Sequence, residues 1–120
     1  MIILSTKNPL IQETAKLTDK KGRKESGLIL VEGPHPIAEA LHAGLELVHL
    51  FCSDPDKVTK NVLNHAPVVV SENVMQHLCT TASPPPYLAT FKQPNASIES
   101  LFEHTSPFIL VVDKLQDPGN

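Results

Sequence analysis

The chain has 120 residues, of which 41% are hydrophobic, and its formal net charge is −3, as in an ordinary globular protein of one compact unit. No apolar run approaches the ~18 residues of a membrane helix, and the first residues lack a signal-peptide pattern, so we expect a cytoplasmic protein without membrane contact. The two cysteines and six histidines show neither a disulfide framework nor a metal-ligand spacing, so no metal site is expected.

The first part of the chain predicts two short helices. Asn8 followed by Pro9 is typical of a helix start, because asparagine caps the helix and proline fits its first turn. This helix should end near Thr18. Residues 19–26 are polar and predict a second helix that stops at Gly27.

The middle of the chain predicts alternating strands and helices. The apolar run 28–31 follows a glycine and is typical of a buried strand. Ser71 is a helix-capping residue, and three consecutive prolines in residues 80–86 require a loop. The other expected elements are a helix over 37–41 closed by Gly44, a strand at 45–52, a helix opened by Asp54-Pro55 that carries Val58, Val62 and Leu63, a strand at 67–70, a helix with Val74, Met75 and Leu78, and a strand at 87–91.

The last part of the chain predicts a separate tail. Residues 93–96 have the composition of a linker, and a short helix over 97–103 and a strand over 108–112 should follow. A lone strand cannot bury its own faces, so residues 97–120 would begin a second, incomplete domain. The alternation of elements before the linker predicts an α/β layered fold with a largely parallel or mixed central sheet.

The loop after the last predicted strand is the most informative motif. Asp-Pro restricts the backbone and Gly119 permits a positive φ, so residues 113–120 form a tight turn. Enzymes with α/β folds place their sites in loops of this kind, although a plain turn is the alternative.

This loop resembles motif 1 of the SpoU family of RNA methyltransferases, which has the approximate form D-x-x-x-D-P-x-N. The front of the chain is similar to the same family: an Asn-Pro helix and a Lys/Arg-rich stretch lead to Val31-Glu32-Gly33, and a G-x-H-x-x-x-E-A-L pattern follows. The resemblance to SpoU/TrmH proteins covers nearly the whole chain.

The resemblance implies a three-layer α/β/α sandwich of the L30e/L7Ae type over residues 1–92, a linker over 93–97, and the start of a truncated, knotted SPOUT catalytic domain over 98–120. It implies that the full-length parent binds S-adenosylmethionine, forms a homodimer and methylates a ribose 2′-OH of rRNA or tRNA. In the family the cofactor loops and a catalytic arginine follow motif 1, so we expect this chain alone to be inactive and to hold no cofactor.

The resemblance also suggests site residues. Asn120 would help to shape the catalytic site, with Asp117, Pro118 and Gly119 forming its loop; Asp113 and Asp117 are more typical of structural turn carboxylates than of an acid or base. Glu32, beside Gly33, is expected to bind backbone N–H groups of its turn. The residues expected to bind structured RNA are Lys7, Asn8, Lys16, Lys20, Lys21, Arg23, Lys24 and His35.

The charge distribution supports an RNA partner. Residues 1–27 carry six basic and three acidic side chains, a net +3, whereas the remainder carries −6. Lysine and arginine neutralise phosphates, and Arg23 could hold a phosphate bidentately. The alternative for these residues is a solvated helix face.

Two other functions fit parts of the sequence. A non-catalytic structured-RNA-binding protein of the L7Ae/L30e type would share the sandwich but does not need the linker or the motif-1 loop. A small α/β domain of another class is the third possibility, although the sequence has no GxGxxG, P-loop, GxSxG or metal motif.

Overall fold

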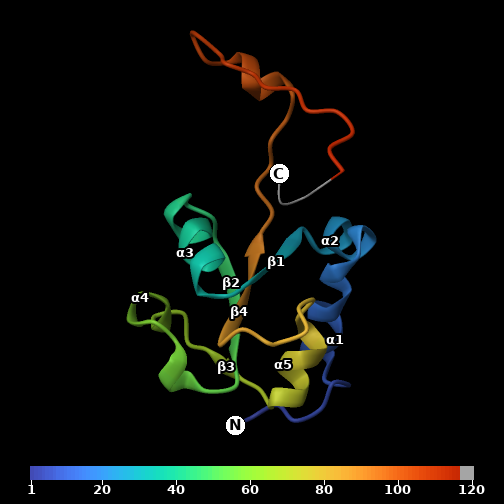
Figure 1. Ribbon diagram of the computed structural model, residues 1–120, viewed down its shortest axis with the longest axis vertical. Helices are drawn as coiled ribbons and strands as arrows, with labels where there is room; N and C mark the ends of the chain where they lie inside the picture. The colour runs from blue at the N-terminus through green and yellow to red at the C-terminus, as the bar shows by residue number, and fades with distance from the viewer. Residues whose placement is uncertain (117–120) are drawn as a thin grey trace.

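The computed structural model describes residues 1–116, which build one four-stranded sheet with helices on both faces (Figure 1). The strand order is β1-β4-β2-β3. The strands are β1 (Leu28–Glu32), β2 (Leu47–Cys52), β3 (Val68–Val69) and β4 (Tyr87–Lys92).

The sheet is mixed, as the sequence predicts, but most of its pairing is antiparallel. β4 lies between β1 and β2 and is antiparallel to both, whereas β2 and β3 are parallel. Ile3 adds an isolated parallel bridge to Val70 beside β3. β1 is therefore an outer strand with one unpaired edge, and the central strand β4 is the last strand in the chain.

Local signals explain where the helices begin and end. The Asn8 side chain accepts a hydrogen bond from the Leu10 backbone N–H (3.0 Å), and the Ser71 hydroxyl accepts one from Val74 (3.3 Å), so both predicted caps are confirmed. Gly27 ends a helix in the left-handed conformation, with φ 69°. The helices are α1 (Pro9–Ala15), α2 (Lys20–Ser26), α3 (Pro34–His42), α4 (Lys60–Leu63) and α5 (Glu72–Leu78), with 3₁₀ turns η1 (Lys16–Thr18), η2 (Pro55–Lys57) and η3 (Glu99–Phe102).

Two apolar clusters, one on each face of the sheet, make the fold a three-layer arrangement. Alternate residues of a strand point to opposite faces, so Ala89 joins one cluster and Leu88 joins the other. The first cluster packs Ile37 of α3 against the sheet, and the second packs Ile11 of α1. None of the helices within residues 1–116 combines the length and apolar character required to span a bilayer.

The structure differs from the sequence prediction in three places. In place of the short helix expected over residues 97–103, only the 3₁₀ turn η3 forms. The helix expected after Asp54-Pro55 is divided into η2 and α4, because Val58 between them is extended (φ −80°, ψ 129°). The strand expected over residues 108–112 is wrong: this segment is exposed and irregular, with Phe108 97% exposed, and it has no partner strand among the described residues. Residues 97–116 extend away from the sheet as a tail (Figure 1).

Candidate nucleic-acid interface

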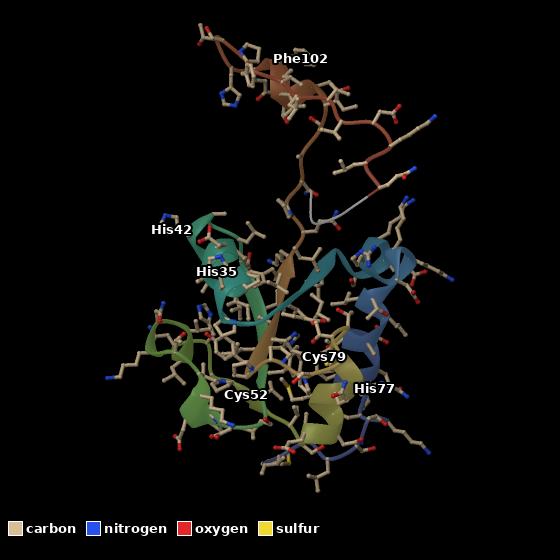
Figure 2. All side chains as sticks on the ribbon, viewed as in Figure 1. His35, His42, Cys52, His77, Cys79 and Phe102 are labelled. Carbon is tan, nitrogen blue, oxygen red and sulfur yellow. The ribbon has the colours of Figure 1, made fainter. Side chains whose placement is uncertain are left out.

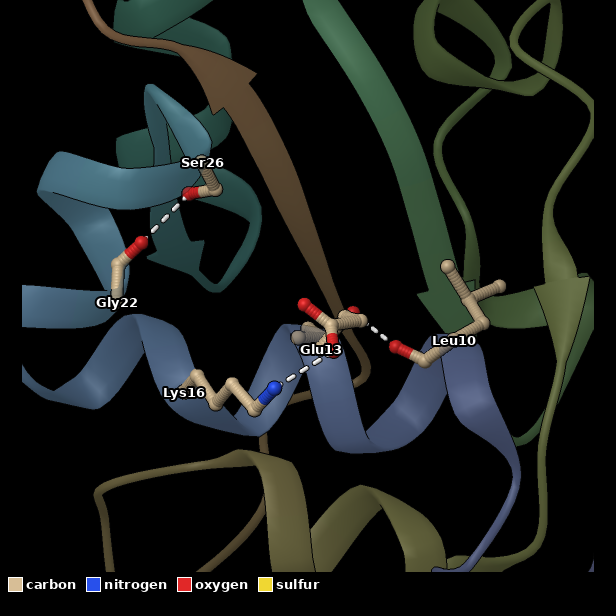
Figure 3. A network of polar contacts seen from close by, with 6 residues as sticks. Leu10, Glu13, Lys16, Gly22 and Ser26 are labelled. Atoms are coloured by element: carbon tan, nitrogen blue, oxygen red, sulfur yellow. Dashed lines mark hydrogen bonds and ion pairs between the residues drawn. The ribbon is translucent and has the colours of Figure 1, made fainter.

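The basic part of the chain folds into a compact helical unit formed by η1 and α2, which we call the basic corner. Gly22 makes this corner possible, because a Cβ atom at this position would lie 2.0 Å from the backbone oxygen of Lys16. The Ser26 hydroxyl donates a hydrogen bond to the Gly22 carbonyl (2.8 Å), which closes the last turn of α2 (Figure 3). Basic side chains from both elements are therefore held close together.

Only some of these cations have an acidic partner. Lys16 donates to Glu13 (2.7 Å; Figure 3), and this hydrogen bond, together with the negative charge of Glu13, raises the pKa of the lysine. Lys21 lies 3.8 Å from Glu25. Within residues 1–116 the remaining lysines of α2, at positions 20 and 24, form no ion pair. Their spacing of four residues places them on one face of the helix, where they can meet phosphates.

Arg23 has a structural role that could not be predicted from the sequence. Its Nη1 atom donates to the carbonyl oxygens of Leu17 and Thr18, each at 2.9 Å, and so satisfies the carboxyl end of η1. The predicted bidentate grip on a phosphate is thus limited to the donors that remain, on Nε and Nη2. The guanidinium is consequently fixed in position before any ligand arrives.

A groove of about 500 Å³ lies between this corner and the unpaired edge of β1. Glu32 stands on its wall, where one carboxylate oxygen accepts a hydrogen bond from the Thr80 backbone N–H (2.7 Å). The carboxylate is structural, as expected, but its partner belongs to a distant loop and not to its own turn. We call this the β1 groove; its lining residues are Leu17, Thr18, Arg23, Ile29, Leu30, Glu32 and Thr80.

The structure separates some residues that the sequence groups together. Lys7 and Asn8 precede α1 and lie at its far end from α2, and the Asn8 side chain is occupied by the helix cap. His35 lies on α3, on the other side of the sheet from the basic corner (Figure 2). The proposed catalytic residues Asp117, Pro118, Gly119 and Asn120 lie outside the described residues.

A second groove, of about 590 Å³, lies between α5 and the proline-rich loop. Met75 and Gln76 line it opposite Pro84, Pro85 and Pro86. The one cation on its wall, Lys57, lies 3.7 Å from Asp54. In the part of the chain that the structure describes, no three His, Cys, Asp or Glu side chains converge to hold a metal ion. The basic corner with the β1 groove is therefore the better candidate for an anionic polymer.

Comparisons with known proteins identify the family of the chain. Residues 8–89 match the family described as the MRM3-like substrate binding domain. A relative in Synechocystis sp., an uncharacterized tRNA/rRNA methyltransferase, is 30% identical over 98% of this chain and 45% of its own length.

The comparison with solved structures also finds RNA methyltransferases. The crystal structure of an RNA 2′-O ribose methyltransferase is 31% identical with a TM-score of 0.75, over 99% of this chain and 48% of the other. The SpoU methyltransferase AviRb from Streptomyces viridochromogenes, solved with AdoMet, is 19% identical with a TM-score of 0.65, over 79% and 39% of the chains, a likeness of fold alone. The chain thus spans about half the length of its relatives.

Proposed function

Because the chain belongs to the MRM3-like substrate binding domain family, we propose that it is the RNA-binding region of an S-adenosylmethionine-dependent rRNA or tRNA 2′-O-ribose methyltransferase of the SpoU type. The observation that carries this proposal is that the family match over residues 8–89 contains the whole basic corner and the β1 groove. The relatives described above carry RNA methyltransferase names.

The described surface suits a partner with a phosphate backbone. Lys20 and Lys24 are exposed cations without acidic partners within residues 1–116, and lysine neutralises phosphates by releasing condensed counterions. Such contacts recognise the shape and backbone of a folded RNA more than its base edges. Phosphate contacts of this kind would position a structured RNA for modification.

The reaction itself would be carried out by the rest of the parent protein. Under this proposal residues 1–92 hold RNA, 93–97 form a linker and 98–120 begin the catalytic domain, with Asn120 and its loop in the catalytic site. S-adenosylmethionine would be held beyond these residues, in a homodimeric parent, and the chain alone would be inactive. A purely RNA-binding L7Ae/L30e-type protein is less favoured, because the relatives are methyltransferases about twice as long.

The proposal is tested by RNA binding at several salt concentrations. Lys20→Gln with Lys24→Gln should weaken binding of a tRNA transcript by the 120-residue chain and reduce the slope of log K against log salt by about 0.7–0.9 for each lost contact. The control is Lys57→Gln with Lys60→Gln, which removes the same charge from η2 and α4.

The control variant should bind nearly as the unmodified chain does. Equal loss in both double variants would mean that RNA responds only to total charge, and the interface assigned to α2 would be wrong. A chain that binds neither tRNA nor rRNA fragments at low salt would contradict the proposed function as a whole.

A further inference from the structure

The β1 groove offers a ligand one apolar surface. Its lining includes the half-buried Ile29 and Leu30, which point to opposite faces of the sheet at the unpaired edge of β1, and Leu17 of η1, which is only 3% exposed. Binding is favourable when a ligand with a weakly hydrated surface covers these apolar side chains and removes them from water. An unstacked nucleic-acid base has such a surface on each of its two faces.

Two groups of opposite charge stand on the walls of the same groove. Arg23 is anchored through Nη1, and Glu32 is anchored through its bond to the Thr80 N–H. Neither forms an ion pair in the described part of the chain. The guanidinium keeps free donors on Nε and Nη2, and the carboxylate keeps a free oxygen and the second lone pair of the bonded one.

These walls select among possible ligands. A phosphate alone would meet the arginine but would be repelled by the Glu32 carboxylate at the other wall. A carboxylate with two available lone pairs is best matched by two adjacent N–H donors, and among the four RNA bases only guanine has this pair, at N1 and N2. Guanine also carries acceptors at O6 and N7, to which arginine donates.

We propose that the β1 groove is a subsite for one unpaired guanine of the bound RNA. Glu32 accepts from the guanine N1–H and N2–H groups, and Arg23 donates to its acceptor edge. Lys20 and Lys24, on the same helix as Arg23, hold the neighbouring phosphates. This inference rests on the proposed function and adds base recognition to a surface that otherwise contacts the RNA backbone.

The test compares RNA stem-loops that differ in one base. Each has a uridine loop whose central nucleotide is guanosine, inosine, adenosine or uridine, and binding to the 120-residue chain is followed by fluorescence anisotropy at low salt. Inosine lacks only the N2 amino group of guanosine, so its stem-loop should bind about tenfold more weakly if Glu32 uses that group.

Two variants test whether the difference in binding between guanosine and inosine loops depends on the β1 groove. Glu32→Gln keeps an oxygen for the Thr80 N–H but loses an acceptor, so guanosine and inosine loops should bind equally. Glu39→Gln, which removes an exposed carboxylate from α3, should keep the tenfold difference. The comparison of loops with the unmodified chain needs no variant and stands even where Glu32→Gln reduces folding.

The outcomes separate this proposal from the proposed function. Equal binding of all four loops by the unmodified chain, or discrimination that survives in Glu32→Gln, overturns the guanine subsite and leaves RNA binding intact. Absence of binding to any loop, to tRNA and to rRNA fragments overturns both.

Discussion

Gly22 is the residue on which the basic corner depends most directly. An added Cβ would overlap the Lys16 backbone oxygen at 2.0 Å, and a backbone atom in a hydrogen-bonded turn cannot move aside as a flexible side chain can. Gly22→Ala should therefore lower the free energy of unfolding by about 3 kcal/mol, at the upper end of overpacking costs. Urea denaturation followed by circular dichroism measures this change.

Gly27 supplies the matched control for that substitution. It has a positive φ of 69° but nothing within 4 Å of an added Cβ. Asparagine tolerates the left-handed conformation, so Gly27→Asn should cost less than about 1 kcal/mol. If Gly22→Ala were as mild as this control, the close packing of α2 on η1 would be contradicted.

The two free cysteines should differ in reactivity. Cys52 is fully buried, and burial, with a smaller effect of the Asp54 carboxylate, raises the pKa of its thiol. Cys79 is half-buried at the end of α5. Since the thiolate is the reactive form, iodoacetamide at mild alkaline pH should label Cys79 quickly and Cys52 only after unfolding in urea. Rapid labelling of both thiols in the native protein would show that Cys52 is accessible.

The raised pKa of Cys52 also has a consequence for stability. The unfolded chain ionises this thiol near the ordinary thiol pKa, which is lower than the pKa of Cys52 in the folded protein. Stability from the neutral thiol is therefore fully present below the ordinary thiol pKa and is lost as pH rises towards the folded pKa. Cys52→Ala should remove this part of the alkaline destabilisation, which equilibrium unfolding between neutral and alkaline pH would detect.

The residues of the candidate interface could be predicted only in part. The lysines of α2 follow from local composition, and the structure indeed gathers them on one short helix. The β1 groove could not be predicted, because it joins Arg23, Glu32 and Thr80, which come from α2, β1 and a loop much later in the chain. Such contacts depend on packing between elements and leave no local signal.

At the scale of elements, the predictions were most accurate where a short-range signal exists. The capped starts of α1 and α5 and the glycine end of α2 depend on hydrogen bonds and backbone angles within a few residues. The helix predicted after Asp54 was too long. Val58 has an extended backbone between η2 and α4, and its side chain is buried in the core, with 5% exposed. Burial in the core outweighed local helix preference there.

The predicted strand over residues 108–112 fails for a different reason. An apolar run indicates burial, but a strand forms only where another strand supplies backbone partners. The described residues contain no such partner for this run, so five consecutive apolar side chains remain exposed from Phe108 to Val112. This exposure supports the proposal that a second domain begins in this part of the chain.

At the scale of the whole molecule, the comparisons confirm the resemblance to SpoU/TrmH proteins, and the mixed α/β fold is confirmed by the structure. The order of the strands could not be predicted from the sequence. Every pair in the sheet joins strands separated by at least one helix, and periodicity does not show which strands pair. The L30e-type sandwich and the domain boundaries remain proposals.

Removal of the tail tests whether the first domain is independent. The last backbone bond that joins it to the sheet runs from the Gln93 N–H to the Gly27 carbonyl (2.8 Å), and later backbone bonds are local. A chain ending at Ala96 should therefore unfold within about 0.5 kcal/mol of the 120-residue chain. It should also bind less of a hydrophobic dye, because exposed side chains such as Phe102 and Phe108 are lost. A loss of stability greater than about 1 kcal/mol would show that the tail packs on the sheet.

The central position of β4 affects how the chain can fold as it leaves the ribosome. β1 and β2 are synthesised early, but both hydrogen-bond to β4, which emerges after every other strand. β2 and β3 can pair with each other earlier, but β1 cannot join the sheet, and the apolar residues of β1 and β2 cannot be fully buried, until β4 has been synthesised as far as Lys92. Pairing of segments so distant in sequence closes large loops and is slow. Stopped-flow refolding should show one late, concerted step in which both apolar clusters form together.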